Sequence, residues 1–338
     1  MRSIKEATVP GKKALLRADL DIPLKNGEVA DDFRIRAALP TMEYLVKNKA
    51  KVIIIAHLDR PGGKVVESLR LNPVAKKLSE HLGAIHKVDD CIGMEVKKAV
   101  GVMGNDDILL LENLRFHPGE EENDLEFAKK LASLADLYVN DCFATSHRQH
   151  ASIVGVPKLL PSYAGLRLEE ETMILHSIIE KAKRPLLFIV GGAKAETKAS
   201  LVKKLAKIAD KILLGGTLMF EQSLEGVPKV LFPVDAVRID DIGPRTIKMF
   251  KEEIKKAKTI VWNGPLGVTL RKEFEVGTRE IARALAESQA FTVVGGGDTV
   301  AALNRFGLRD KMDFVSTGGG SLLQFLADGT LPGLEALH

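Results

Sequence analysis

The chain has 338 residues, which exceeds the length at which a single hydrophobic core keeps growing, so we expect two domains. Apolar residues make up 45% of it, enough for a sizeable core in each domain, and the net charge is only +4. The acidic and basic residues are interspersed and only 5% of the residues are aromatic, which argues against a nucleic-acid-binding protein.

No apolar run approaches the roughly 18 residues that a membrane-spanning helix requires. The first residues also lack the apolar core of a secretory signal. The two cysteines, Cys91 and Cys142, are far apart and fit no CxxC or zinc spacing, so we expect buried, reduced thiols. Together these features predict a soluble cytoplasmic protein with no membrane partner.

Short apolar runs alternate with amphipathic helical segments along the whole chain, which predicts α/β architecture with mainly parallel sheets. In the first half, each apolar run ends in charged or polar residues; the runs are 14–19, 52–60, 108–116 and 137–143. Helices are expected at 34–48, 72–82 and 124–135.

The domain boundary is expected near residues 156–165, where two prolines and a glycine precede a long polar helix at 166–183. We therefore predict two doubly wound, Rossmann-like parallel-sheet domains joined by a hinge helix. The first domain would cover residues 1–164, the interdomain helix 165–183, and the second domain 184–324.

In the second half the apolar runs end in glycines; these runs are 186–194, 212–216, 260–267, 292–298 and 314–320. Only the run at 230–235 departs from that pattern, and a further helix is expected at 277–288. Ligands of open parallel sheets bind beyond the carboxyl ends of the strands. One half therefore offers charged side chains and the other offers exposed backbone, which indicates two half-sites for two different anionic ligands.

Eight charged or titratable residues of the first half stand at predicted strand ends or at the start of the first helix. They are Arg17, Asp19, Arg34, His57, Arg60, Arg115, His147 and Arg148. Taken singly, each arginine is explained as well or better by a local carboxylate partner or a solvated position. Asp19 could either anchor Arg17 or accept a hydrogen bond from a ligand hydroxyl.

The placement of these cations together favours a ligand-binding role over separate structural roles. Five arginines in one cleft would repel one another by roughly 1 kcal/mol per close pair in water, and by more in a partly dry pocket. The nearby acids cannot neutralise the whole set; they are Asp19, Asp21, Asp59 and Glu112. A multiply charged phosphate or carboxylate ligand could do so, and arginine forks match its oxygens.

Two glycine-rich turns of the second half, GGAK (191–194) and GGGDT (295–299), are suited to phosphate at a helix N-terminus. Neither is a P-loop, and Val300 occupies the third glycine position of the dinucleotide fingerprint. Lys194 and Lys198 are one helical turn apart, so both can face the same phosphates. Asp298 is the best candidate ligand for Mg²⁺, although it could also cap the following helix.

These motifs, in this order, resemble the phosphoglycerate kinase family along essentially the whole chain. In the first half the matching segments are 17–23, 31–40, 56–61, 109–121 and 138–152. In the second half they are 191–194, 233–235, 241–246, 262–268, 293–299 and 315–321.

The resemblance implies reversible phosphoryl transfer from 1,3-bisphosphoglycerate to ADP, giving 3-phosphoglycerate and ATP, in a Mg²⁺-dependent monomer. It also implies that a tail at 325–338 packs back onto the first domain, and that Arg34 and Lys194 act in catalysis. The implied phosphoglycerate-binding residues are Asp19, Asp21, Arg34, His57, Arg60, Arg115, His147 and Arg148. The implied nucleotide-binding residues are Gly192, Lys194, Lys198, Gly215, Gly216, Asn263, Gly296, Gly297, Asp298, Thr299, Gly318 and Gly319, with Gly215 and Gly216 lining the adenine pocket.

Several positions depart from the family pattern. Asp21 stands in place of an asparagine, Thr197 in place of an aspartate, and Leu270 in place of the glutamate that would hold the ribose hydroxyls. The stretch 219–244 is also shorter than in the family, which predicts a trimmed adenine pocket or an altered nucleotide preference. The alternative function is therefore a catalytically impaired phosphometabolite-binding or scaffold protein, while the missing fingerprint disfavours a nicotinamide dehydrogenase.

Overall fold

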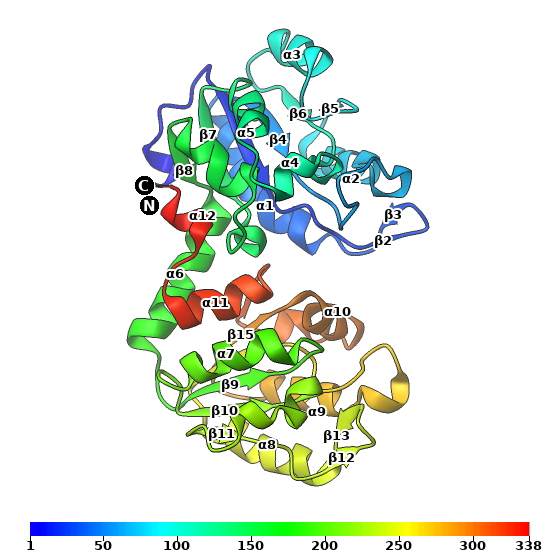
Figure 1. The fold of residues 1–338 in the computed structure, drawn as a ribbon, viewed down its shortest axis with the longest axis vertical. Coiled ribbons are helices and arrows are strands. Elements are labelled where there is room, and N and C mark those ends of the chain that lie inside the picture. Colours follow the sequence, from blue (N-terminus) through cyan, green and yellow to red (C-terminus); the bar gives the residue numbers. More distant parts are fainter. Residues whose placement is uncertain (338) are drawn as a thin grey trace. The chain divides into compact units, whose positions relative to one another are not determined.

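The computed structural model describes residues 1–337 and divides into two compact units. Unit 1 comprises Met1–Thr172 together with the residues from Leu331 onward, and unit 2 comprises Met173–Thr330. Each unit is a six-stranded parallel sheet flanked by helices, so the predicted α/β class with two parallel-sheet domains is confirmed (Figure 1). No helix within residues 1–337 combines the length and apolarity that a bilayer span requires.

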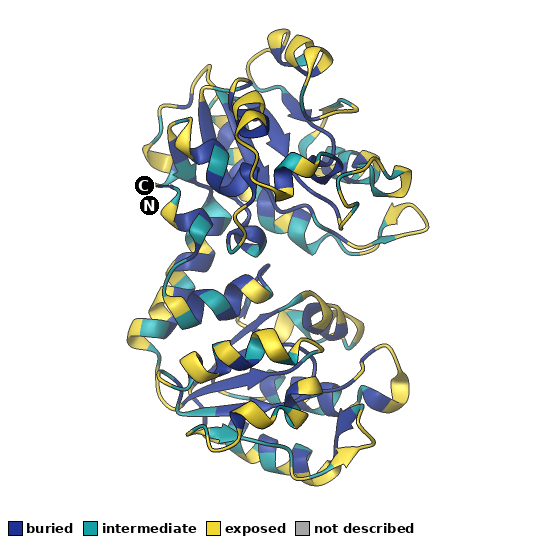
Figure 2. Ribbon diagram, viewed as in Figure 1, coloured by how far each residue is buried: buried dark blue, intermediate teal, exposed yellow. Residues whose placement is uncertain are grey.

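The sheet of unit 1 has the strand order β5-β6-β4-β1-β7-β8. Its strands are β1 (Lys13–Ala18), β4 (Lys51–Ile55), β5 (His86–Lys87), β6 (Ile108–Leu110), β7 (Leu137–Asp141) and β8 (Ser162–Ala164). The central strands are continuous apolar runs because helices cover both faces of a parallel sheet. Figure 2 shows them dark blue, as buried, beneath helices whose outer faces are exposed.

Helices of unit 1 lie at the three segments predicted for them, 34–48, 72–82 and 124–135, and further helices lie outside those segments. The helices are α1 (Phe33–Lys47), α2 (Asn72–Leu82), α3 (Met94–Gly101), α4 (Pro118–Glu121), α5 (Leu125–Ala132) and α12 (Pro332–Glu335). In α1 the residues Ile35, Ala38, Met42 and Leu45 form the buried face that packs into the core of this unit. A small antiparallel ribbon, β2 (Leu24–Lys25) with β3 (Glu28–Val29), precedes α1.

The sheet of unit 2 has the strand order β11-β10-β9-β14-β15-β16. Its strands are β9 (Leu186–Val190), β10 (Lys211–Leu214), β11 (Val230–Leu231), β14 (Thr259–Asn263), β15 (Phe291–Gly295) and β16 (Phe314–Val315). The helices are α7 (Ala195–Leu205), α8 (Pro244–Lys256), α9 (Val276–Ala286), α10 (Gly297–Arg305) and α11 (Gly320–Asp328). The completely buried Trp262 on β14 belongs to the core of this unit.

Each sheet reverses its winding direction once, and this reversal creates a crevice at the carboxyl ends of two neighbouring strands. This position is called the switch point of the sheet; in unit 1 it lies between β1 and β7, and in unit 2 it lies between β9 and β14. The chain therefore places Asp19 and Cys142 beyond one pair of strands, and Gly191 and Gly264 beyond the other.

The predicted interdomain helix is α6 (Leu166–Lys181), and the boundary between the two units falls inside it. Its N-terminus is held by buried Asp141, whose Oδ1 accepts hydrogen bonds from the backbone N–H groups of Arg167 (2.9 Å) and Leu168 (3.1 Å). Burial raises the pKa of Asp141 to about 7 despite these bonds. A Cβ at Gly165 would lie 2.2 Å from Asp141 Oδ1, so this close approach requires glycine.

The residues near the C-terminus divide between the two units. Residues 325–330 group with unit 2, because Phe325 and Leu326 lie on the buried face of α11. Only the residues from Leu331 onward group with unit 1, where Gly333 donates its N–H to the carbonyl of Ser146 at 2.8 Å.

The stretch that was predicted to be short contains no α-helix between β10 and α8, and all of its residues are described. It consists of 3-10 turns, the edge strand β11, and an antiparallel ribbon formed by β12 (Ala236–Val237) and β13 (Asp241–Ile242). Buried Asp241 ties this ribbon to α9, because its Oδ2 accepts the N–H of Gly277 at 2.8 Å. Burial raises the pKa of Asp241 to about 6.

Candidate functional site

Arg17 lies at the carboxyl end of β1 and is completely buried. Its Nε donates to Ser152 Oγ (2.9 Å), its Nη1 to the carbonyl of Ala18 (2.8 Å), and its Nη2 to Nδ1 of His57 (2.9 Å). A guanidinium can only donate, so Nδ1 of His57 must be the acceptor. Arg17 therefore has a positioning role toward His57.

His57 is neutral in this environment. Burial lowers its pKa well below the usual range, and the positive charges of Arg17, Arg115 and Arg34 lower it further. Since Nδ1 accepts from Arg17, the proton resides on Nε2, which lies 3.6 Å from Asp21 Oδ2. His57 consequently presents a neutral N–H donor at the switch point of unit 1.

Arg34, in the first turn of α1, forms the main ion pair of this region. Its Nη1 lies 2.9 Å from Asp19 Oδ1 and 3.8 Å from Asp21 Oδ2. Asp19 therefore anchors Arg34, and no hydrogen bond or ion pair between described residues joins it to Arg17. Burial raises the pKa of Asp19 although Arg34 opposes the shift, and its buried Oδ2 has no hydrogen-bond partner. That atom is available to a ligand hydroxyl.

Arg115 lies on the 3-10 turn Leu114–Phe116. Its Nη1 donates to the carbonyl of Asp59 at 2.8 Å, and its Nε lies 3.2 Å from Glu121 Oε1. Burial lowers its pKa, and the charge of Arg17 adds to that shift. Its charge also acts on His57, so the structure brings Arg115 into the cluster.

The remaining predicted cations lie closer to solvent. Arg148 is exposed and His147 is half-buried, and both contribute to the low pKa of neighbouring His150. Arg60 is exposed, and no interaction among the described residues joins it to the cluster. The expectation of an unneutralised set of five arginines is too strong, because Arg34 and Arg115 have carboxylate partners.

The sequence interpretation missed three buried residues that support the cluster. Glu120 accepts hydrogen bonds from Ser152 through Oε1 (Oγ, 2.6 Å) and Oε2 (backbone N–H, 2.9 Å). His150 Nδ1 lies 3.9 Å from Glu120 Oε1, and burial together with Arg115 lowers the pKa of His150 to about 3. Glu120 thus orients Ser152, Ser152 orients Arg17, and Arg17 fixes the tautomer of His57. The sequence offered one signal for these residues, because all three lie inside the segments 109–121 and 138–152 that carry the family resemblance.

In unit 2 the glycines after β9, β10 and β14 let three loops pack backbone against backbone. Gly192 donates its N–H to Pro265 (2.7 Å), and Gly216 donates its N–H to Leu266 (2.9 Å). A Cβ at Gly216, where φ is +56°, would lie 2.5 Å from Gly192 N. Gly215 is buried against Leu266. These N–H groups are used within the protein, so the glycines first of all shape the loops.

Asn263, at the end of β14, connects the first turns of α7 with the glycine segment that precedes α11. Its Oδ1 accepts from Lys198 Nζ (3.1 Å), and its Nδ2 donates to the carbonyl of Gly319 (3.0 Å). Burial lowers the pKa of Lys198 to about 8; Asp298 opposes this shift, whereas Lys194 adds to it. A nearby anion would restore the full charge of Lys198.

The second glycine loop places an unpaired carboxylate next to this lysine. Gly296 donates its N–H to the carbonyl of Gly318 at 3.0 Å, and buried Thr299 Oγ1 accepts the N–H of Gly264 at 2.9 Å. Thr299 therefore holds a loop in place. Asp298 is exposed in the first turn of α10, and within residues 1–337 it has no hydrogen bond or ion pair.

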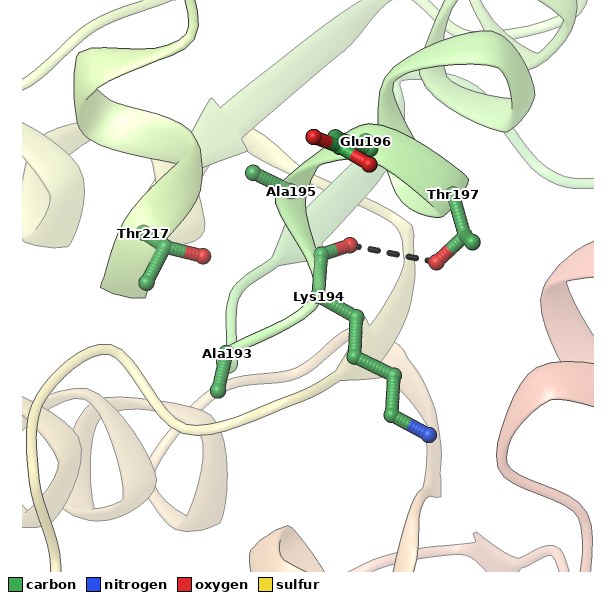
Figure 3. A pocket seen from close by; sticks show the side chains of 6 residues that line it. All are labelled: Ala193, Lys194, Ala195, Glu196, Thr197 and Thr217. Atoms are coloured by element: carbon green, nitrogen blue, oxygen red, sulfur yellow. Dashed lines mark hydrogen bonds between the residues drawn. The ribbon is translucent and has the colours of Figure 1, made fainter.

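A pocket of about 370 Å³ opens at the N-terminal end of α7 (Figure 3). Its lining residues are Ala193, Lys194, Ala195, Glu196, Thr197 and Thr217. Figure 3 shows the side chain of Lys194 extending away from Glu196, while the hydroxyl of Thr197 donates to the carbonyl of Lys194 at 3.3 Å. The pocket combines a helix N-terminus with a free ammonium group, which suits a phosphate.

Comparison with known proteins points to one family. The phosphoglycerate kinase family model matches residues 4–225 and 221–329. The chain is 44% identical to the phosphoglycerate kinase of Dictyoglomus turgidum, with 99% of this chain and 98% of that protein covered. It is 43% identical to that of Trichodesmium erythraeum, with the same coverage.

Solved phosphoglycerate kinase structures are similar over the whole chain. The enzyme of Pyrococcus horikoshii OT3 has a TM-score of 0.89 at 32% identity, covering 100% of this chain and 98% of that one. That of Coxiella burnetii has a TM-score of 0.82 at 34% identity, covering 99% and 98%. The alignment with the Dictyoglomus protein runs over 387 positions, although this chain has only 338 residues. The two segments matched by the family model meet at 221–225, inside the stretch predicted to be shortened. The chain belongs to the phosphoglycerate kinase family.

Proposed function

We propose that this kinase transfers a phosphoryl group reversibly between the carboxyl group of 3-phosphoglycerate and ADP, so that 1,3-bisphosphoglycerate and ADP give 3-phosphoglycerate and ATP. The observation that carries the proposal is the cluster around His57 at the switch point of unit 1. It combines arginines, a neutral imidazole donor and a buried carboxylate oxygen without a partner. A ligand bearing phosphate, carboxylate and hydroxyl groups matches all three features.

The exposed cations of unit 1 are suited to the phosphate of this ligand. Arg60 and Arg148 form no ion pair among the described residues, and His147 lies beside Arg148 in the chain. Asp19 Oδ2 is suited to the hydroxyl, because a buried oxygen without a partner gains a hydrogen bond when the ligand arrives. Arg34 and the Nε2–H group of His57 would then face the carboxyl group of the ligand.

Unit 2 is suited to the nucleotide phosphates. Lys194 lies at the pocket of about 370 Å³, and Lys198 lies one turn further along α7. The burial that lowers the pKa of Lys198 means that a phosphate would draw a proton onto this lysine. The N-termini of α7 and α10 add their backbone dipoles.

Asp298 fits a magnesium ion bound together with the nucleotide. Its carboxylate is exposed and unpaired among the described residues, and Mg²⁺ takes one or two carboxylates along with phosphate oxygens and water. When bound, the ion would neutralise phosphate charge. Asp298 would hold it, and the lysines would neutralise the remaining phosphate oxygens.

The chemistry requires no general base, because the attacking oxygen of 3-phosphoglycerate is an ionised carboxylate. One O–P bond forms to that oxygen as the O–P bond to the β-phosphate oxygen of ADP breaks. Positioning and charge stabilisation then supply most of the rate, and we assign the neutralisation of the migrating group to Arg34 and Lys194. Donor and acceptor bind to different units, so turnover requires a hinge, for which α6 and residues 316–317 are the candidates.

A coupled assay with ATP and 3-phosphoglycerate tests this function directly. We expect ADP formation that depends on 3-phosphoglycerate and saturates with it. The alternative, a binding protein without turnover, is favoured by Leu270, which is 92% exposed, and by the shortened 219–244 stretch. Calorimetric binding of both ligands with no ADP formation would support that alternative.

A further inference from the structure

Three side chains of the kinds that bind zinc meet in unit 1, and none of them belongs to the predicted phosphoglycerate-binding or nucleotide-binding residues. Asp90 and Cys91 follow β5, and His117 immediately precedes α4. One ligand atom of each residue lies within 4.8 Å of the other two. The two segments are 26 residues apart in the chain, a spacing that corresponds to no recognisable zinc motif.

Hydrogen bonds and packing already fix the positions of these three side chains, the 90–91–117 cluster. His117 Nε2 lies 2.7 Å from Asp90 Oδ1, and the same oxygen accepts the N–H of Cys91 at 2.6 Å. The carbonyl of Asp90 accepts the N–H of Glu112 at 3.3 Å. The imidazole of His117 packs against the ring of Phe127 with centroids 5.5 Å apart. Ligands held by backbone bonds and packing lose little conformational freedom when a metal binds.

The thiol of Cys91 has no other role among the described residues. It is completely buried, it is not part of a disulfide, and its sulfur makes no hydrogen bond. A buried thiol without a hydrogen-bond partner is a ligand of the kind that suits Zn²⁺.

We propose that Asp90, Cys91 and His117 form a zinc site, with water in a fourth position. Sulfur and imidazole ligands favour Zn²⁺ over Mg²⁺ or Ca²⁺. Tetrahedral zinc with bonds of about 2.0–2.3 Å places its ligand atoms about 3.5 Å apart. To bind the ion, the 2.7 Å contact between His117 Nε2 and Asp90 Oδ1 would widen modestly, and the sulfur of Cys91 would move closer to both atoms. Asp90 is exposed, so solvent reaches the site.

Binding would replace the S–H bond of Cys91 with an S–Zn bond, and the proton would pass to solvent without any redox change. His117 would bind as neutral imidazole, giving up its contact with Asp90 to the metal. The ion would tie residues 90–91 to residue 117, two positions after Arg115. We therefore expect zinc to stabilise unit 1 against thermal unfolding.

Cobalt spectroscopy on the untagged, metal-stripped full chain tests the sulfur ligand. Titration with Co²⁺ should produce the thiolate-to-cobalt charge-transfer absorption and saturate at one equivalent. Cys91→Ala should abolish that absorption. Cys142→Ala is the matched control and should retain it, because Cys142 is equally buried but lies outside the cluster. Absence of the thiolate absorption in the wild-type chain would overturn the proposal.

Competition with a chromophoric chelator measures the zinc affinity and keeps the test independent of whether Cys91→Ala folds. His117→Gln should weaken zinc binding more than about tenfold, since even outer-shell changes cost that much. His86→Gln, at an exposed histidine on β5, should leave the affinity unchanged. Equal affinity of the wild-type chain and His117→Gln would show that the ion binds adventitiously and would refute the site. None of these measurements depends on kinase activity.

Discussion

Arg17 donates a hydrogen bond from Nη2 to Nδ1 of His57 across 2.9 Å, and this bond determines which nitrogen of the imidazole carries the proton. The guanidinium is fixed in turn by Ser152, and Ser152 by the buried carboxylate of Glu120. A chain of buried hydrogen bonds therefore orients a neutral Nε2–H group of His57 at the switch point of unit 1. Such networks rigidify a site when every member has a partner.

The two buried histidines each contribute a loss of stability in mild acid. The pKa of His57 is lowered well below 6.5 in the folded state, and that of His150 to about 3. Below pH 6.5 these two histidines bind protons in the unfolded chain but not in the folded chain, so their contribution to the free energy of unfolding falls as the pH falls. The raised pKa values of Asp141 and Asp241 contribute in the opposite direction, so the histidine contribution is isolated by comparing variants. Each histidine contributes a slope of up to about 1.4 kcal/mol per pH unit.

Urea unfolding between pH 7.5 and 5 measures this slope. His150→Gln should flatten it, whereas His81→Gln, at an exposed histidine of α2, should not. A slope that is the same in the wild-type chain and His150→Gln would contradict a neutral, buried His150.

Removing Arg34 should affect turnover far more than nucleotide binding. Its guanidinium lies at the switch point of unit 1, where the migrating group would arrive, and loss of one such stabilising group costs about a hundredfold or more in kcat. We expect Arg34→Ala to show that loss in the coupled assay, with ADP affinity by calorimetry nearly unchanged. Arg36→Ala, on the exposed side of the same helix, is the control and should retain activity. An unaltered kcat in Arg34→Ala would exclude Arg34 from catalysis.

Asp298→Ala should remove the metal dependence of nucleotide binding. In the wild-type chain ADP should bind more tightly with Mg²⁺ than with EDTA, because the exposed carboxylate is suited to the ion. In the variant the two affinities should converge. Asp310→Ala, at a fully exposed aspartate of the same unit, should behave like the wild type. Retention of the full magnesium effect in Asp298→Ala would place the ion elsewhere.

Nucleotide binding should be accompanied by proton uptake near pH 8. Burial lowers the pKa of Lys198 to about 8, so about half of these lysines are neutral at that pH. A phosphate nearby favours the charged form and raises the pKa, so up to about half a proton should be taken up per nucleotide. Calorimetry in two buffers with different ionisation enthalpies measures this uptake.

Lys198→Met should abolish that uptake, whereas Lys203→Met, at an exposed lysine of α7, should leave it intact. Uptake that persists in Lys198→Met would assign the proton to another group.

The sequence by itself determined the elements of this protein and their order. Continuous apolar runs such as 186–190 predict buried parallel strands, and the spacing of Leu39, Met42, Leu45 and Val46 predicts a buried helix face. In the structure Met42 and Leu45 are buried on α1, whereas Leu39 and Val46 are only partly buried against the core. The ordered motifs also identified the family, which the comparisons confirmed. These features are local, because the periods of helices and strands and the positions of glycines can be recognised within a few residues.

Only the tertiary structure decided which side chains meet. The sequence left open whether Asp19 anchors Arg17 or binds a ligand. The packing of α1 on the sheet pairs its Oδ1 with Arg34 and leaves its Oδ2 without a partner. Gly216 was expected to line a nucleotide pocket, yet its missing Cβ makes room for the backbone of Gly192. Cys91 and His117 become neighbours because the pairing of β5 with β6 brings distant segments together. Strand order and side-chain direction set such contacts, and neither follows from the spacing of residues along the chain.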